Sequence, residues 1–222
     1  DGVGDLEHCA ANVALALESL AEHFASSRVV LDAPPARRGG EDYLPLGALT
    51  NDTLAELIVR LLPEDAIVCD EALSSVTRLF PTSYDAAPHD YLQITGGAIG
   101  IGIPLATGAA IACPDRKVIT LQADGSGMYT LQGLWTQAHE NLNAITIILA
   151  NRKYALLLDE MRRMGVKQPE HLARPMFDLT DPVLDWVVLA KGMGVEGARV
   201  STAEEFVKMF KVALKRNGPF LI

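Results

Sequence analysis

The chain has 222 residues, a formal net charge of −9 and 49% hydrophobic residues, the composition of an ordinary globular protein. The acidic balance without a basic patch argues against nucleic acid as a partner, and the longest apolar runs are too short to cross a bilayer. We expect neither a secretory signal nor membrane association. Three cysteines without metal-ligand spacing, Cys9, Cys69 and Cys113, predict reduced thiols in a cytoplasmic protein.

The first 48 residues differ in pattern from the rest of the chain. Apolar residues at helical spacing predict one amphipathic helix in residues 1–28, which we interpret as the end of a preceding domain. Residues 29–48 are rich in proline, glycine and charge, as expected of an exposed linker. Residues 49–222 form the predicted α/β domain. Because Pro219–Ile222 resembles a strand, we expect this domain to be cut short at its carboxyl end.

The α/β domain should begin with a capped helix. Thr50 and its two polar successors offer N-capping side chains, and Pro63 ends the pattern. The apolar positions between them lie on one helical face; they are Leu54, Leu57, Ile58 and Leu61. Near the other end of the domain, Ser201-Thr202 with Glu205 predicts a second capped helix.

Two predicted strands flank the middle of the domain. Val118–Leu121 is a short β-rich run that ends before Asp124-Gly125, and Ala144–Ala150 is a nearly unbroken apolar run, typical of a strand buried on both faces. The segment between them is long enough for a crossover helix. The pattern therefore predicts a right-handed β-α-β unit, and with it a parallel sheet covered by helices on both faces.

The crossover helix has its own predicted orientation. Four apolar residues fall at helical spacing and should face the sheet, while Gln137 and its polar neighbours face elsewhere; the apolar four are Leu131, Leu134, Trp135 and Ala138. We interpret Trp135 and Trp186 as core residues.

The carboxyl ends of parallel neighbouring strands meet at one edge of a sheet, so we expect Asp124 and Asn151 to lie together. A carboxylate and an amide oxygen suit Mg²⁺, which prefers hard oxygen ligands. The backbone carbonyl of Lys153 is the third protein ligand that we expect. The Gly125 and Ser126 amides near a helix start can receive phosphate oxygens. The pattern predicts a site for a metal-held diphosphate.

Asn151 follows Asp124 by 27 residues, at the end of the next strand. This arrangement resembles the thiamine diphosphate motif of the decarboxylase and acetohydroxyacid synthase superfamily, and similarity is best to benzoylformate decarboxylases and acetolactate synthase-like proteins. The resemblance implies thiamine diphosphate and Mg²⁺ as cofactors. It also implies the thiamine diphosphate-binding fold, with this chain supplying the diphosphate-binding (PP) domain.

The resemblance assigns further cofactor contacts. Gly96–Pro104 looks like the glycine-rich turn under the cofactor, in which Gly97 offers its carbonyl to the aminopyrimidine and Ile99 bends the cofactor into its V shape. Val68–Ser75 resembles the strand and turn that place a hydroxyl, here Ser74, on the diphosphate. The remaining cofactor contacts that it implies are Ala98, Tyr154 and Ala155.

The chain departs from the family pattern at three small residues. Ala123 stands where a glycine is usual, Ala150 where a first asparagine is usual, and Ala155 where a glycine is common. None of these changes removes an expected ligand. Relatives of the pyruvate decarboxylase type carry a catalytic glutamate at the point where this chain reads Ala155–Leu158, and such an apolar wall is more typical of a benzoylformate-type site.

The resemblance also implies what this chain lacks. In the superfamily, the carboxylate that activates the cofactor belongs to a pyrimidine-binding domain, so no catalytic residue is assigned here. We expect that domain as a partner, in the same enzyme or another subunit, together with a homodimer or homotetramer and a small 2-oxo acid substrate. The expected activity is that of a 2-oxo acid decarboxylase or carboligase. Two alternatives stay open: a non-catalytic α/β dimerisation scaffold, and the small subunit of a two-chain decarboxylase.

Leu156–Thr180 interrupts the α/β rhythm with charged residues, Gly165 and two prolines. Its length suits a lid over the cofactor. We expect this lid to be disordered or atypical in shape until cofactor binds.

Overall fold

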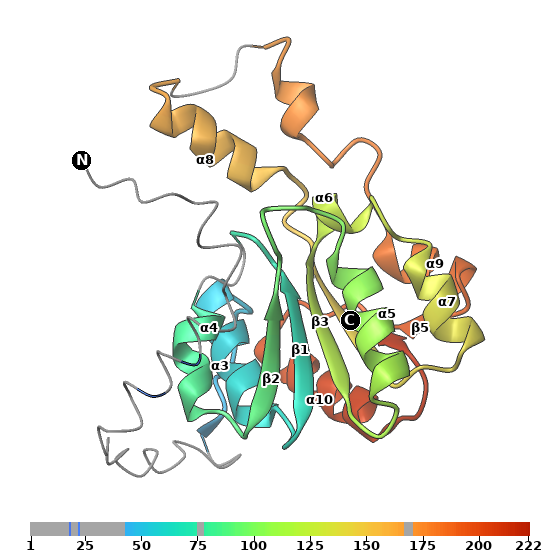
Figure 1. Ribbon diagram of the computed structural model, residues 1–222. Coiled ribbons are helices and arrows are strands. Elements are labelled where there is room, and N and C mark those ends of the chain that lie inside the picture. Colours follow the sequence, from blue (N-terminus) through green and yellow to red (C-terminus); the bar gives the residue numbers. More distant parts are fainter. Residues whose placement is uncertain (1–17, 19–21, 23–42, 75–77, 167–170) are drawn as a thin grey trace. The chain divides into compact units, whose positions relative to one another are not determined.

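The computed structural model describes residues 18, 22, 43–74, 78–166 and 171–222. The elements below belong to the unit Arg37–Ile222 (Figure 1). Apart from residues 18 and 22, the predicted helix in residues 1–28 lies outside the described residues, as does most of the linker in residues 29–48, so both stay predictions. In chain order the elements are α3 (Asn51–Leu61), β1 (Ala66–Glu71), α4 (Leu79–Thr82), η2 (Ser83–Asp85), β2 (His89–Gln93), α5 (Gly102–Ala112), β3 (Val118–Ala123), α6 (Asp124–Gly127), α7 (Gly133–His139), β4 (Ala144–Leu149), α8 (Ala155–Arg163), η3 (Arg174–Phe177), α9 (Trp186–Gly192), β5 (Glu196–Gly197), α10 (Ala203–Lys215) and β6 (Phe220–Leu221).

In the part of the chain that the structure describes, six parallel strands form one sheet in the order β2-β1-β3-β4-β6-β5. The predicted parallel pairing of β3 and β4 is confirmed, and their register places Ala123 opposite Leu149. The chain leaves β1 for β2 on one side and then returns to β3 on the other side. This reversal makes the boundary between β1 and β3 a topological switch point. Open α/β sheets bind their ligands at such a point, just beyond the carboxyl ends of the strands.

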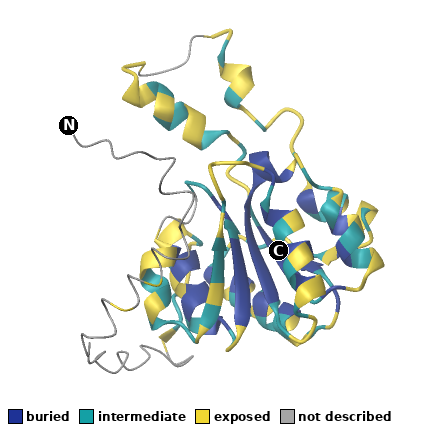
Figure 2. Ribbon diagram, viewed as in Figure 1, coloured by how far each residue is buried: buried dark blue, intermediate teal, exposed yellow. Residues whose placement is uncertain are grey.

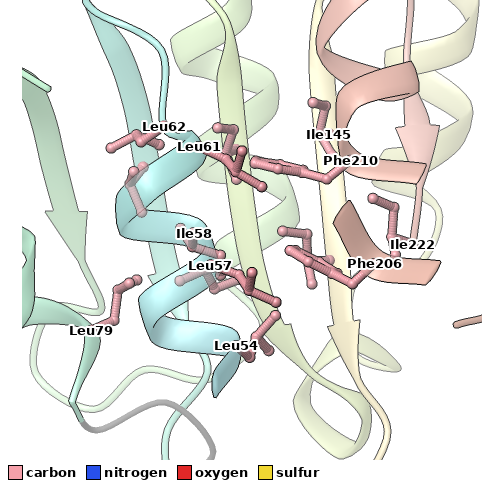
Figure 3. Close-up of a cluster of buried hydrophobic side chains, with 14 of the residues drawn as sticks. Leu54, Leu57, Ile58, Leu61, Leu62, Leu79, Ile145, Phe206, Phe210 and Ile222 are labelled. Atoms are coloured by element: carbon pink, nitrogen blue, oxygen red, sulfur yellow. The ribbon is translucent and has the colours of Figure 1, made fainter. Parts of the chain in front are cut away.

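Alternate residues of the strands face two helical layers. Val68 and Ile119 belong to the cluster formed with α3 and α10, in which Phe206 and Phe210 stack at 5.3 Å between ring centroids (Figure 3). On the opposite face, Cys69 packs with α5 residues. A further cluster joins α5, α7 and α9. The prediction of helices on both faces of a parallel sheet is confirmed.

The central strands are buried on both faces, as their apolar sequences predict. Every residue of β3 is buried, and Figure 2 shows the middle of the sheet as the least exposed part of the fold. Isoleucine, valine and leucine supply most of this surface, whose removal from water contributes on the order of 25 cal/mol per Å². The sheet therefore holds its strand ends, and the polar residues that follow them, in fixed positions.

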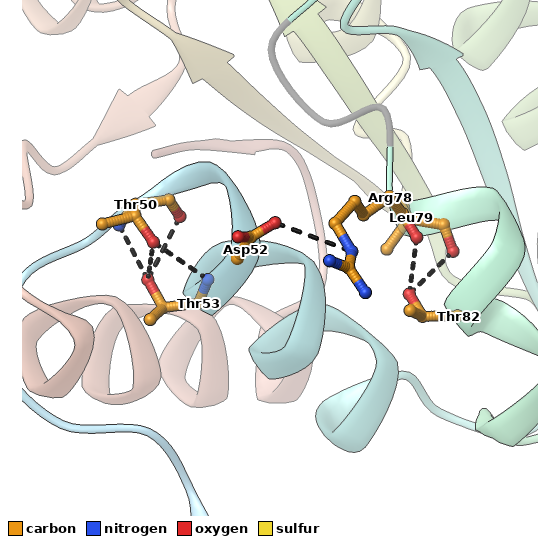
Figure 4. Close-up of polar contacts among 6 residues, drawn as sticks. All are labelled: Thr50, Asp52, Thr53, Arg78, Leu79 and Thr82. Atoms are coloured by element: carbon orange, nitrogen blue, oxygen red, sulfur yellow. Dashed lines mark hydrogen bonds and ion pairs between the residues drawn. The ribbon is translucent and has the colours of Figure 1, made fainter.

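Both predicted helix caps are present. The Thr50 hydroxyl accepts the Thr53 backbone N–H at 3.2 Å, while the Thr50 backbone N–H donates to the Thr53 side chain at 2.7 Å (Figure 4). The same reciprocal arrangement joins Thr202 and Glu205 at the start of α10. Figure 4 also shows the 3.7 Å contact of Asp52 with Arg78, which links α3 to the residue before α4.

The predicted orientation of the crossover helix is correct for Leu134, which is buried with Leu131 and Ala138 packed against its cluster, and wrong for Trp135 and Gln137. Trp135 is 54% exposed and stacks on His139 at the surface, whereas Gln137 is fully buried. The Gln137 amide donates to the Thr107 hydroxyl at 3.2 Å, so a polar side chain serves the contact between α7 and α5. The helix is also short, and only Leu134 and Gln137 are buried in it. Apolar spacing therefore identified Leu134 but misplaced Trp135 and Gln137. Trp186, by contrast, is buried as predicted.

Helix α9 begins at Trp186, because Asp185 is its N-cap and accepts the Val188 N–H at 3.1 Å. The predicted lid contains α8, none of whose residues is buried, and the short η3. Among the described residues, no helix combines the length and apolar character that a bilayer span requires.

Candidate functional site

The predicted site residues gather at the carboxyl edge of the sheet. Ser74 follows β1, Asp124 follows β3, and Asn151 follows β4, three strands that are neighbours in the sheet. The glycine-rich turn lies between β2 and α5 at the same edge. The fold therefore brings residues from four loops to the switch point between β1 and β3, where parallel sheets bind ligands.

Asp124 is a buried acid at this edge and is only 2% exposed. Its carboxylate accepts the Arg152 backbone N–H at 2.6 Å and the Gly125 N–H at 2.9 Å. Burial raises the pKa of Asp124, and these backbone hydrogen bonds oppose the rise. A carboxylate that is desolvated but held by two donors is ready to gain a cation.

The loop after β4 is fixed to Asp124 by the bond to the Arg152 N–H. Within the loop, the Asn151 side-chain oxygen accepts the Lys153 N–H at 3.0 Å. Arg152 has a positive φ of 57°, which turns the chain sharply at this point. The structure thus brings Asp124 together with the loop that carries Asn151 and Lys153, as the sequence analysis expected.

The same loop is paired with the end of the lid. The Tyr154 N–H donates to the Phe177 carbonyl at 3.0 Å, and the Leu179 N–H donates to the Arg152 carbonyl at 3.0 Å. Lys153 and Asp178 form an antiparallel bridge between these contacts. A movement of the lid would therefore reach the loop that contains the expected metal ligands.

Gly125 is packed beneath an aromatic ring. A Cβ atom added at Gly125 would lie 2.5 Å from Tyr154 Cε1 and 2.8 Å from Tyr154 Cδ1. Only glycine fits under this ring, which explains the residue type at the turn after β3. Ser126 is buried as well, and its hydroxyl accepts the Gln122 side-chain amide at 2.8 Å. The Gly125 N–H, which was expected to face phosphate, is bonded to Asp124 here.

The glycine-rich turn presents exposed residues beside this buried set. Gly97, Ala98 and Ile99 are exposed, and Ile99 retains 41% of its surface. Gly97 has a φ of +71°, a conformation that favours glycine. The Ala98 N–H donates to the Thr95 carbonyl at 3.2 Å and closes the turn. An apolar side chain exposed at the edge of a polar site is available for contact with a ligand.

Sequence reasoning missed two buried polar residues below the site, Glu71 and Gln122. Both are fully buried, and they are opposite each other in neighbouring strands β1 and β3. The signal that could have identified them is a polar side chain in the last positions of an otherwise apolar strand, where burial requires a hydrogen-bond partner.

The donors at this edge fit Mg²⁺. One carboxylate, one amide oxygen and one backbone carbonyl are hard oxygen ligands, which leave room for phosphate and water oxygens. In the part of the chain that the structure describes, no three His, Cys, Asp or Glu side chains cluster to hold a metal ion. Binding of a metal ion at Asp124 would thus require phosphate and water oxygens as well as those of the protein.

An open parallel sheet with an acidic, glycine-lined loop cluster at its switch point defines a phosphate- and metal-binding α/β domain. The family described as "Thiamine pyrophosphate enzyme, C-terminal TPP binding domain" matches residues 76–222. The chain belongs to this family, and the predicted thiamine diphosphate-binding fold is confirmed.

Two curated proteins resemble nearly the whole chain. "Putative acetolactate synthase large subunit IlvX" of Mycobacterium tuberculosis is 43% identical over 208 residues, which are 93% of this chain and 40% of that protein. Benzoylformate decarboxylase of Pseudomonas aeruginosa is 34% identical over 215 residues, 95% of this chain and 38% of that protein. The chain thus spans about two-fifths of the length of these relatives.

A solved structure gives the same result. The thiamine diphosphate-dependent 4-hydroxybenzoylformate decarboxylase of Rhodococcus jostii RHA1 superposes with a TM-score of 0.72 at 32% sequence identity. The match covers 92% of this chain and 38% of that structure's chain. The family resemblance stated from the motif alone is confirmed by sequence and by fold.

Proposed function

We propose that this chain is the diphosphate- and Mg²⁺-binding part of a thiamine diphosphate-dependent 2-oxo acid decarboxylase or carboligase. The observation that supports this most directly is the bond from the Arg152 N–H to the buried Asp124 carboxylate, which joins the two halves of the expected metal site. Thiamine diphosphate, when bound, supplies the carbanion chemistry of such enzymes. The residues of this chain bind and orient it.

Each group of residues has a separate task in this proposal. Asp124, the Asn151 side-chain oxygen and the Lys153 carbonyl hold Mg²⁺. The thiamine portion rests on the exposed glycine turn through the Gly97 carbonyl and Ile99. The residues proposed to lie along the diphosphate are Ser74, Ala98, Gly125, Ser126, Tyr154 and Ala155.

The substrate side of the site is apolar at α8. Leu156 and Leu157 are 44% and 51% exposed, which leaves apolar surface for a substrate or partner to cover. This favours a 2-oxo acid with an apolar or aromatic group, in line with the two benzoylformate-type decarboxylases among the relatives. We assign no catalytic residue to this chain.

A pyrimidine-binding domain, in the same enzyme or in another subunit, is the proposed partner, in a homodimer or homotetramer. Helix α5 supports this: it contains no charged residue, yet Pro104, Gly108 and Ile111 on it are exposed. A helix that is apolar on all sides is normally buried. We place the enzyme in the cytoplasm, since the described thiols of Cys69 and Cys113 are free.

A direct test is calorimetric titration with thiamine diphosphate, with and without Mg²⁺. Wild type should bind only with the metal. Asp124→Asn should weaken binding by at least about tenfold, since it replaces the charged ligand. Asp115→Asn, an exposed change in the turn that precedes the other end of β3, is the matched control and should bind normally.

Two results would contradict the proposed function. One is binding that ignores Mg²⁺ or the Asp124 change. The other is the absence of binding even when the pyrimidine-binding domain of a relative is added, which would favour the non-catalytic scaffold.

A further inference from the structure

A pair of buried polar side chains lies directly under the proposed site. Glu71 is the last residue of β1, and Gln122 is its partner in the parallel register of β3. Both are fully buried. A buried carboxylate is costly unless hydrogen bonds satisfy it, so its partners indicate what it is there to hold.

The partners of Glu71 belong to the glycine-rich turn. One carboxylate oxygen accepts the Gly100 N–H at 2.5 Å, and the other accepts the Gly102 N–H. Gly100 has a φ of +86°, and Gly102 is the first residue of α5. Glu71 therefore fixes the end of the turn that carries Gly97 and Ile99, although it lies far from them in sequence.

The turn packs on this pair without spare room. A Cβ atom at Gly102 would lie 2.4 Å from Gln122 Oε1 and 3.0 Å from Glu71 Oε2. Any displacement of the turn toward the sheet would meet these atoms. Glu71 and Gln122 thus set how closely the glycine-rich turn approaches the ends of the strands.

Gln122 also holds the second turn of the site. Its side-chain amide donates to the Ser126 hydroxyl at 2.8 Å, and a Cβ atom at Gly127 would lie 3.0 Å from Gln122 Cγ. Ser126 and Gly127 follow Asp124 in α6. Gln122 therefore positions the turn that carries the proposed metal ligand.

We propose that Glu71 and Gln122 are positioning residues that align the two halves of the cofactor site. Glu71 sets the glycine turn under the thiamine rings, and Gln122 sets the Asp124 turn under the diphosphate. Neither contacts the cofactor in this scheme. The inference rests on the proposed function, and it deepens it by separating the residues that orient the thiamine end from those that orient the diphosphate end.

The decisive variant is Glu71→Gln. Glutamine has the same shape but offers only one acceptor oxygen, so its amide would face one of the two N–H donors. The chain is titrated with two probes in Mg²⁺, thiamine diphosphate and inorganic pyrophosphate. Glu71→Gln should lower the affinity for thiamine diphosphate about tenfold or more, as expected for a lost charge-assisted hydrogen bond. The affinity for pyrophosphate should stay within about twofold of wild type.

Two further variants complete the comparison. Gln122→Met keeps the length of the side chain but removes its hydrogen-bond donor. It should lower the affinity for both probes, because both contain the diphosphate. Gly102→Ala pushes on the turn without changing a buried charge, and it should reproduce the selective loss for thiamine diphosphate. Glu56→Gln, an exposed change on α3, is the control and should affect neither probe.

Hydrogen exchange of the ligand-free chain gives a second readout. Glu71→Gln should speed exchange of the Gly100 and Gly102 amides by at least about tenfold, and leave the β4 amides unchanged. Equal weakening of both probes, or unchanged exchange at Gly100 and Gly102, would overturn the proposal. If wild type binds neither probe even when the pyrimidine-binding domain of a relative is added, the proposed function fails, and the exchange result still decides whether Glu71 holds the turn.

Discussion

At the scale of single residues, the protonation of Asp124 links stability to the proposed binding of Mg²⁺. Its pKa is raised in the fold, mainly by burial, above the ordinary value that it has when the chain is unfolded. The folded state therefore holds the proton more tightly. The stability that this proton contributes is complete below the ordinary pKa and is lost as pH rises through the raised pKa.

This shift predicts a pH-dependent difference between wild type and Asp124→Asn. In urea titrations, the unfolding free energy of wild type minus that of the variant should fall as pH rises through the acid range, since only wild type loses the proton. Excess Mg²⁺ with thiamine diphosphate should reduce the fall, because in the proposed site Mg²⁺ binds the charged form of Asp124 and bridges it to the diphosphate. If the difference in unfolding free energy does not change with pH, burial does not raise the pKa of Asp124.

At the scale of elements, the contact between α6 and the loop before α8 requires a residue without a Cβ atom at Gly125. Gly125→Ala would place its Cβ 2.5 Å from the Tyr154 ring, so the ring and its loop must move. We expect a loss of about 1–3 kcal/mol in unfolding free energy, the usual range for overpacking.

A double-mutant cycle tests this origin of the loss. Gly125→Ala combined with Tyr154→Ala should cost clearly less than the sum of the two single changes, because the clash needs both groups. Gly108→Ala on the exposed side of α5, where a Cβ would meet nothing within 4 Å, is the control and should raise stability by about 0.5–1 kcal/mol. Additive losses at Gly125 and Tyr154 would contradict the clash.

At the scale of the whole molecule, the exposed side of α5 is the surface that we expect a partner domain to cover. Ile111 is 58% exposed on this helix. Ile111→Lys should leave the unfolding free energy of the isolated chain within about 0.5 kcal/mol of wild type. The same change should weaken association with a pyrimidine-binding domain by at least about tenfold, since it buries an unpaired charge.

Analytical ultracentrifugation of the mixed domains measures this association. Glu140→Lys, an exposed change after α7, serves as a control for added charge. Unchanged association in Ile111→Lys would place the partner on another face.

The sequence by itself determined strands β3 and β4, their parallel β-α-β order and the proximity of Asp124 to the Asn151 loop. Each of these strands is an apolar run followed directly by polar residues, so the local sequence pattern marks both the strand and its end. Both helix caps followed from Thr50 and Thr202 for the same reason.

Only the tertiary structure decided that Trp135 faces outward and Gln137 inward in α7, because a seven-residue helix contains too few turns for spacing to define a whole face, and Gln137 is buried in contact with Thr107. The bonds of Glu71 to Gly100 and Gly102 were likewise invisible in sequence. They join residues about thirty positions apart, and a long-range hydrogen bond leaves no local pattern.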